Sequence, residues 1–177
     1  LGAPNFAEAM RMGVEVSLRL PEVIRKRHGA DTYRPGHLGG IGAPAADPRA
    51  VLDTLLAAVE DAGYGGRFVL SLDCATSHLF DREANVYAMS FGRLSPEEMV
   101  DYFAELVRDY PIFMLEDPLH EDDFEGFRFG IAVEAKIGKK FAEAIPAAIP
   151  LAVVLVFVDE KCLLQAVQGG RDLLDEQ

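Results

Sequence analysis

Apolar residues along this chain follow two patterns that alternate. In one pattern, short runs are almost entirely apolar, as in strands that are buried on both faces of a parallel sheet. In the other pattern, apolar residues recur every three or four positions, which is typical of helices with one buried face. The predicted strands cover residues 68–73, 112–116 and 151–159, and the predicted helices cover residues 5–20, 22–28, 48–63, 94–110, 131–145 and 160–174. This alternation predicts an α/β fold with a parallel sheet.

Residues at the predicted helix ends have the side chains that such positions need. Asn5 can cap the first helix, with Glu8 three residues on, as in a capping box. Asp47 and Ser95 can cap the two helices that follow. Pro21 should break or kink the first helix, because proline lacks the N–H that a helix interior uses.

The first helix carries apolar residues at regular spacing. Phe6, Met10, Val14 and Leu18 lie four positions apart, which is the spacing of one helix face. We interpret Met10 and Met12 as core filler, since the flexible thioether side chain fills irregular gaps between packed elements.

Three segments between the predicted helices and strands allow more than one interpretation. Residues 29–48 contain four glycines between positions 36 and 42, but their spacing matches neither common phosphate-binding motif. This loop is either a flexible connection or an active-site lid. Residues 75–93 predict a loop or small hairpin, in which we interpret His78 as a polar loop residue. The acidic residues within 120–127 either form a solvated face or help to position a cation.

Composition and charge narrow the class of protein. The 177 residues fit one domain, and the net charge of -12 disfavours binding to nucleic acid. The most apolar run, residues 145–158, is too short to span a bilayer and contains two prolines. Cys74 and Cys162 stand in no metal-ligand spacing, which indicates reduced thiols. We expect a cytoplasmic protein without a signal peptide, and the initial Leu1 suggests a fragment.

All three predicted strands end in an acidic residue. Asp73 closes the first strand and Glu116 closes the second. Because the carboxyl ends of parallel strands meet at one edge of a sheet, these carboxylates can share a hard divalent cation such as Mg2+. Without a cation the two charges would repel each other. We interpret Cys74, which directly follows Asp73, as a packing residue rather than a nucleophile.

Four stretches of the chain resemble the barrel domain of the enolase family, the phosphopyruvate hydratases of glycolysis. They are residues 5–16, 71–80, 94–107 and 111–127. The resemblance implies part of an enolase-like TIM barrel, and Mg2+-dependent interconversion of 2-phosphoglycerate and phosphoenolpyruvate. It places Asp73 and Glu116 at the positions of two magnesium ligands. It also implies a small phosphorylated carboxylic acid as substrate and a homodimer.

The chain departs from the family pattern at its acid–base residues. Leu38 stands where the catalytic acid is expected, and leucine cannot donate a proton. The adjacent His37 can replace that acid only along a different loop path. No Gly-Asp-Asp segment supplies the third metal ligand, which leaves Asp159 as the remaining candidate. The family's base lysine belongs to strands that this sequence does not contain.

The sequence therefore leaves activity open while it predicts the family. We expect residues 1–127 to form the enolase-like portion, and residues 128–177 to form a divergent α/β segment packed on the same domain. The first hypothesis is an enolase-family protein that is impaired or inactive as this chain alone. The alternatives are a non-catalytic homologue that acts as a binding or structural module, and a diverged enzyme for another phosphorylated or carboxylated small molecule.

Overall fold

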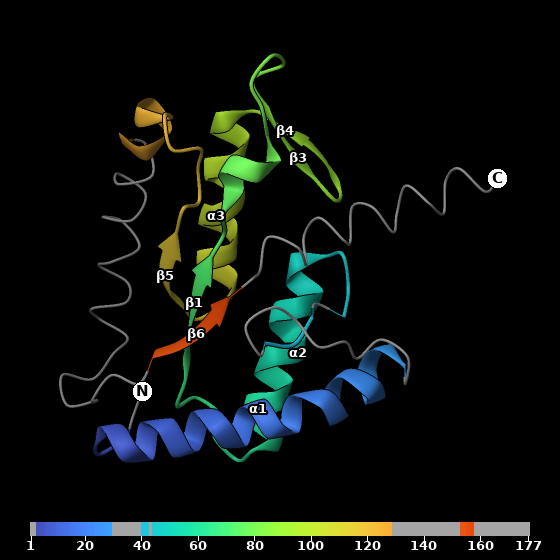
Figure 1. Ribbon diagram of the computed structural model, residues 1–177, viewed down its shortest axis with the longest axis vertical. Coiled ribbons are helices and arrows are strands. Elements are labelled where there is room, and N and C mark those ends of the chain that lie inside the picture. Colours follow the sequence, from blue (N-terminus) through green and yellow to red (C-terminus); the bar gives the residue numbers. More distant parts are fainter. Residues whose placement is uncertain (1–2, 30–39, 43, 129–152, 158–177) are drawn as a thin grey trace.

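The computed structural model describes residues 3–29, 40–42, 44–128 and 153–157 (Figure 1). The elements in chain order are α1 (Phe6–His28), α2 (Pro48–Asp61), β1 (Val69–Asp73), the 3-10 helix η3 (Thr76–Leu79), β2 (Phe80–Asp81), β3 (Val86–Met89), β4 (Gly92–Leu94), α3 (Pro96–Asp109), β5 (Ile112–Glu116) and β6 (Val153–Phe157). Helices and parallel strands alternate, so the predicted α/β class is confirmed.

A parallel sheet lies at the centre of the described structure. Its strand order is β5-β1-β6, and β1 pairs in parallel with both neighbours. The three arrows run in the same direction in Figure 1. A separate antiparallel sheet of β2, β3 and β4 follows β1, as the predicted hairpin region requires. Within the described residues the parallel sheet has three strands and does not close into a barrel.

Helix α3 begins as its sequence predicts. The Ser95 side chain accepts a hydrogen bond from the Glu98 backbone N–H, and the Glu98 carboxylate accepts one from the Ser95 N–H. This capping box satisfies two donors that have no partner inside the helix. Pro96 occupies the first turn, where a missing N–H costs nothing. On the inward face, Phe103 and Leu106 are buried.

The main core lies on one face of the parallel sheet. Leu70 and Leu72 of β1 pack there with Leu52 of α2 and Phe103 of α3. Since side chains alternate along a strand, Leu70 and Leu72 mark the face that α2 and α3 cover. The intervening position, Ser71, and the strand-end acid therefore belong to the opposite face.

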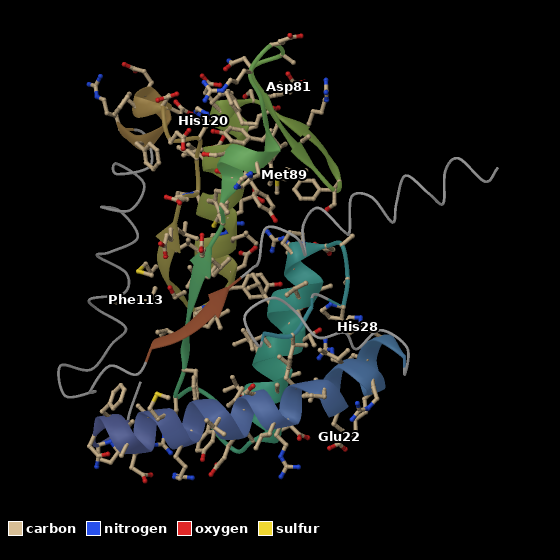
Figure 2. The ribbon with its side chains drawn as sticks, in the orientation of Figure 1. Glu22, His28, Asp81, Met89, Phe113 and His120 are labelled. Atoms are coloured by element: carbon tan, nitrogen blue, oxygen red, sulfur yellow. The ribbon has the colours of Figure 1, made fainter. Side chains whose placement is uncertain are left out.

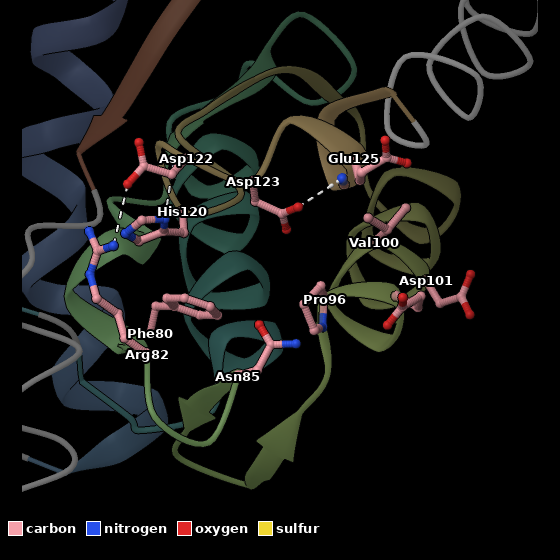
Figure 3. Close-up of a pocket in the computed structure, with 12 residues that line it drawn as sticks. Phe80, Arg82, Asn85, Pro96, Val100, Asp101, His120, Asp122, Asp123 and Glu125 are labelled. Atoms are coloured by element: carbon pink, nitrogen blue, oxygen red, sulfur yellow. Dashed lines mark hydrogen bonds and ion pairs between the residues drawn. The ribbon is translucent and has the colours of Figure 1, made fainter.

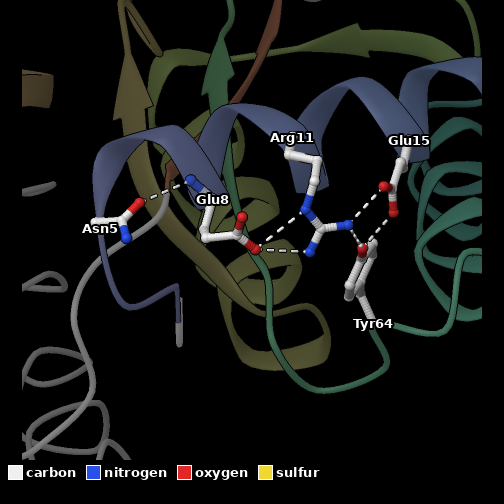
Figure 4. Close-up of polar contacts among 5 residues, drawn as sticks. All are labelled: Asn5, Glu8, Arg11, Glu15 and Tyr64. Atoms are coloured by element: carbon white, nitrogen blue, oxygen red, sulfur yellow. Dashed lines mark hydrogen bonds and ion pairs between the residues drawn. The ribbon is translucent and has the colours of Figure 1, made fainter.

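A polar network ties the start of α1 to the loop after α2 (Figure 4). The Asn5 side chain caps the helix by accepting a hydrogen bond from Glu8 N–H at 2.9 Å. Arg11 pairs with Glu8 at 2.8 Å and also contacts Glu15. The Tyr64 hydroxyl donates to Glu15, and this hydrogen bond is the main reason that the pKa of Glu15 is lowered. These contacts hold α1 in place at the surface.

Helix α1 continues through Pro21 as a single helix of 23 residues. Of the two expectations for Pro21, a break or a kink, the break is therefore wrong. Val23 and Ile24, on the far side of the proline, are both buried, and this packing compensates for the lost backbone hydrogen bond. Among the described residues, no helix combines the length and the apolar character needed to cross a membrane.

The buried face of α1 differs from the one that its most regular spacing indicates. Met12 and Val16 are buried against α2, whereas Phe6 is 80% exposed and Leu18 is 73% exposed. Met10 is 53% exposed, so its interpretation as core filler is wrong. At 3.6 residues per turn, Met12 and Val16 lie on nearly the opposite side from the stripe of four-residue spacing. Helix α1 thus has two apolar faces, of which the described structure covers one.

Because only one face of α1 is buried, alanine substitutions at two methionines of this helix should differ greatly in their effect on stability. Met12→Ala should lower the free energy of unfolding by about 2–5 kcal/mol, because it opens a cavity in the core. Met10→Ala should change it by less than about 0.5 kcal/mol, as at other exposed sites. Urea unfolding followed by circular dichroism measures both. Equal losses for the two variants would show that the other face of α1 is buried as well.

Candidate metal centre

Strands β1 and β5 bring the two predicted ligands together. Asp73 and Glu116 are Cα partners in the parallel ladder, and each is the last residue of its strand. Neighbouring strands lie about 4.8 Å apart, so the two carboxylates can reach one cation. Asp73 is half-buried and Glu116 is exposed. The sequence prediction that these acids meet at one sheet edge agrees with this register.

Backbone hydrogen bonds fix the two strand ends beyond the sheet itself. Cys74 N–H donates to the Glu116 carbonyl at 2.8 Å, and Thr76 N–H donates to the Asp117 carbonyl at 3.2 Å. The Thr76 hydroxyl donates to the same Asp117 carbonyl at 2.9 Å. The candidate ligands are thus held by the residues directly after them. Sequence reasoning missed Thr76, although its β-branched side chain is buried.

Both strand ends lead into a strained turn. Ala75, two residues after Asp73, has φ 43°, and Asp117, directly after Glu116, has φ 45°. Non-glycine residues in this left-handed region cost roughly 1–2 kcal/mol, and aspartate tolerates it better than alanine. Such strain is often retained where it positions functional groups. Its presence beside both acids supports a functional role for this edge.

The thiol of Cys74 is affected by the negative charge at this edge. Burial raises the pKa of the Cys74 thiol, and the negative charges of Asp73, Asp117 and Glu116 raise it further. The thiol therefore stays protonated and is a poor nucleophile. Cys74 is also a member of the buried core cluster, which confirms its predicted packing role. The same negative charges make this edge a better site for a cation than for an anion.

The donor set at this edge fits a hard divalent cation. Carboxylate oxygens are the protein ligands that Mg2+ prefers, and Asp73 and Glu116 supply them from fixed strand ends. Ser71 adds a hydroxyl on the same face of β1, and among the described residues that oxygen has no hydrogen-bond partner. An unsatisfied buried oxygen next to two paired acids is consistent with a missing polar ligand.

Comparison with known proteins identifies the fold to which this edge belongs. A family model described as the enolase C-terminal TIM barrel domain matches residues 1–142 of this chain. The chain belongs to the enolase family. The predicted fold, part of an enolase-like TIM barrel, is thereby confirmed. In a TIM barrel the C-terminal ends of the strands form the active-site face, and Asp73 and Glu116 lie at such ends.

Curated relatives named enolase are similar to this enolase-family chain over 71–72% of its length. The enolase of Methanocaldococcus jannaschii is 40% identical over 127 residues, which are 72% of this chain and 30% of that protein. The enolase of Methanococcoides burtonii is 39% identical over 127 residues, covering 71% and 29%. The enolase of Methanopyrus kandleri is 38% identical over 128 residues, covering 71% and 30%. The chain thus spans about 30% of the length of these relatives.

A second polar region of the enolase-family chain lies apart from the strand-end acids. It is a cavity of about 670 Å3 between the hairpin, the start of α3 and the loop after β5 (Figure 3). Neither Asp73 nor Glu116 lines it. The residues around it are Phe80, Arg82, Asn85, Pro96, Glu97, Val100, Asp101, His120, Asp122, Asp123, Glu125 and Gly126. Asp122, Asp123 and Glu125 belong to the loop for which the sequence left two interpretations, whereas Glu97 and Asp101 belong to α3.

One cluster at this cavity, which includes the His120 labelled in Figure 2, has the residue types of a metal site. His120, Glu121 and Asp122 carry ligand atoms that lie within 4.8 Å of one another. However, Arg82 already pairs with Asp122 at 3.3 Å and with Glu121 at 3.8 Å. The His120 Nδ1 accepts a hydrogen bond from Asp122 N–H at 3.1 Å, so this nitrogen already has a protein partner. The two carboxylates and Nδ1 are thus engaged within the protein, unlike the strand-end acids that face one another.

Several residues singled out from the sequence fall elsewhere. His78 lies in η3 and is exposed, as expected for a polar loop residue. Leu38, His37, Asp159 and Cys162 lie outside the described residues. Their proposed roles therefore remain predictions. β6, the strand before Asp159, pairs with β1 on the side away from β5.

Proposed function

We propose that this chain provides the metal-binding strands of an enolase, with Asp73 and Glu116 as Mg2+ ligands. The reaction is the interconversion of 2-phosphoglycerate and phosphoenolpyruvate. The observation that supports this proposal best is the in-register pairing of the two acids at the C-terminal ends of β1 and β5. A cytoplasmic location and a homodimer are part of the same proposal and follow the expectation for the family.

The negative charge of the chain provides a physical reason for a bound cation. The chain carries a formal net charge of -12, and the substrate is a small phosphorylated carboxylic acid, so the two repel each other. A bound Mg2+ supplies positive charge where the substrate carboxylate develops negative charge during proton removal. Asp73 and Glu116 hold their carboxylates in place for this purpose, since their strand ends are locked through Cys74 and Thr76.

We also propose that residues 128–177 pack on the same domain as residues 1–127. The support is β6, which comes from the C-terminal part of the chain and pairs with β1 along residues 153–157. β1 is the central strand of this sheet and pairs with both β5 and β6. The two parts of the chain therefore share one sheet, so they cannot unfold independently as separate domains would. Limited proteolysis tests this: protection of residues 153–157 together with β1 supports one domain, and their early release contradicts it.

The chain alone is expected to form no measurable phosphoenolpyruvate from 2-phosphoglycerate and Mg2+. Leu38 occupies the position of the catalytic acid, and the sequence lacks the strand that carries the base lysine. An absorbance assay with purified chain measures the product, and a complete enolase is the positive control. Product formation that disappears in Asp73→Ala would contradict this expectation and show an active chain.

A non-catalytic binding or structural module is the second candidate function. The replacement of the acid by Leu38 favours it, because a module has no need for proton transfer. The two candidates differ in their use of the metal: a module predicts that Mg2+ neither binds nor stabilises the chain. Under that reading Glu116→Gln would leave folding and any partner binding unchanged.

A further inference from the structure

Ser71 lies in the middle of β1 on the same face as Asp73. Its neighbours Leu70 and Leu72 pack into the core beneath α2 and α3, which fixes the direction of the alternation. Ser71 and Asp73 are two positions apart, so both belong to the face that these helices do not cover. On this face, Ser71 is only 1% exposed.

The Ser71 hydroxyl differs from the other fully buried hydroxyls of the described chain. Thr54 donates to the Ala50 carbonyl at 2.6 Å, and Thr76 donates to the Asp117 carbonyl at 2.9 Å. The Ser71 Oγ has no partner among the described residues. Met114 and Leu155 are in register with it on the two neighbouring strands, and neither residue type offers a good hydrogen-bond partner. Such a buried orphan is rare and calls for an explanation.

We propose that the Ser71 hydroxyl binds a water molecule of the cation held by Asp73 and Glu116. This inference rests on the proposed function. Residues two apart in a strand have Cα atoms about 6.6 Å apart, which makes a water more suitable than direct coordination. A Mg2+–water distance of about 2.1 Å and a hydrogen bond of about 2.8 Å let a bound water bridge the gap. Mg2+ also keeps several waters when it binds to proteins. Ser71 is thus a positioning residue that orients the hydrated ion.

The test compares Mg2+ binding to four versions of the 177-residue chain by titration calorimetry. Ser71→Ala should weaken Mg2+ binding about 10–100-fold, the usual effect of removing a partner of metal-bound groups. In the metal-free chain the same change removes an orphaned hydroxyl, so the melting temperature should rise by roughly 2–4 °C. The other two variants are Asp73→Ala and a matched control at Tyr102.

Tyr102 provides the matched control because its hydroxyl is the other buried hydroxyl without a partner among the described residues. It belongs to α3, on the helix-covered side of the sheet. Tyr102→Phe should also raise the melting temperature of the metal-free chain, but it should leave Mg2+ affinity unchanged. If Ser71 had a purely structural role, Ser71→Ala would likewise leave the Mg2+ affinity unchanged.

The outcomes separate this inference from the function on which it rests. Unchanged Mg2+ affinity in Ser71→Ala, with binding lost in Asp73→Ala, would overturn the role of Ser71 alone. A lower melting temperature or a failure to fold in metal-free Ser71→Ala would also overturn it, because the hydroxyl would then have a protein partner. A wild-type chain that binds no Mg2+, or an Asp73→Ala chain that binds as well as the wild type, would overturn the proposed metal site itself.

Discussion

Replacing Tyr87 with alanine should lower the free energy of unfolding by about 3–5 kcal/mol. Tyr87 is 0% exposed and has the largest side chain among the fully buried residues of the described structure. Its ring centroid lies 4.9 Å from that of Phe80, within the main core. The change would remove a large apolar volume that neighbouring elements cannot refill. Chemical denaturation in urea measures the loss. An m-value equal to that of the wild type checks that unfolding is still two-state.

The Tyr87 hydroxyl accounts for a separable part of this loss. It accepts a hydrogen bond from His120 N–H at 2.8 Å, and burial raises its pKa, which keeps it protonated. Tyr87→Phe leaves that buried N–H without a partner, so it should cost about 1–3 kcal/mol. Tyr110→Phe is the matched control, because the Tyr110 hydroxyl contacts Asp53 at an exposed position. A Tyr87→Ala chain within about 1 kcal/mol of wild type would contradict this account of the core.

Asp73→Ala should remove the stabilisation of the chain by Mg2+. A ligand at a hundred times its Kd stabilises the folded state by about 2.7 kcal/mol, and the variant should gain almost none of this at the same concentration. Without metal, the variant should be no less stable than wild type, because the repulsion between two neighbouring carboxylates is relieved. Thermal unfolding with and without Mg2+ gives both quantities.

Glu121→Ala is the control that locates the ion. Glu121 belongs to the rival cluster with His120 and Asp122, and the substitution removes the same unit of charge. If Mg2+ binds between the strand ends, Glu121→Ala keeps the full stabilisation. Loss of stabilisation in Glu121→Ala, with Asp73→Ala unaffected, would assign the ion to the cluster beside the cavity.

Much of the fold was predictable because local chemistry and packing agree. The β5 strand has the predicted bounds, and the cap at Ser95 forms as the sequence indicates. These features depend on a few adjacent residues, whose preferences are local. The meeting of Asp73 with Glu116 was predictable for a different reason. Parallel strands have a fixed direction, so residues at their C-terminal ends must share an edge.

Other features depend on long-range contacts that the pattern of apolar residues does not specify. The regular stripe on α1 predicts a helix, but only the position of α2 decides that Met12 is buried and Met10 is not. The left-handed turn at Ala75 has no local signature, since alanine disfavours it. The place of β6 beside β1 likewise follows from long-range pairing. The strand ends were therefore predictable, while the turns that lock them were not.

The most direct test of the metal site is a crystal structure of the chain grown with Mn2+ in place of Mg2+. Anomalous scattering would locate the ion independently of any assumption about its ligands. We predict a peak at the edge where β1 and β5 end, with carboxylate oxygens of both Asp73 and Glu116 about 2.1 Å from the ion, as for Mg2+. An ion bound by His120, Glu121 and Asp122, with none between Asp73 and Glu116, would contradict the account.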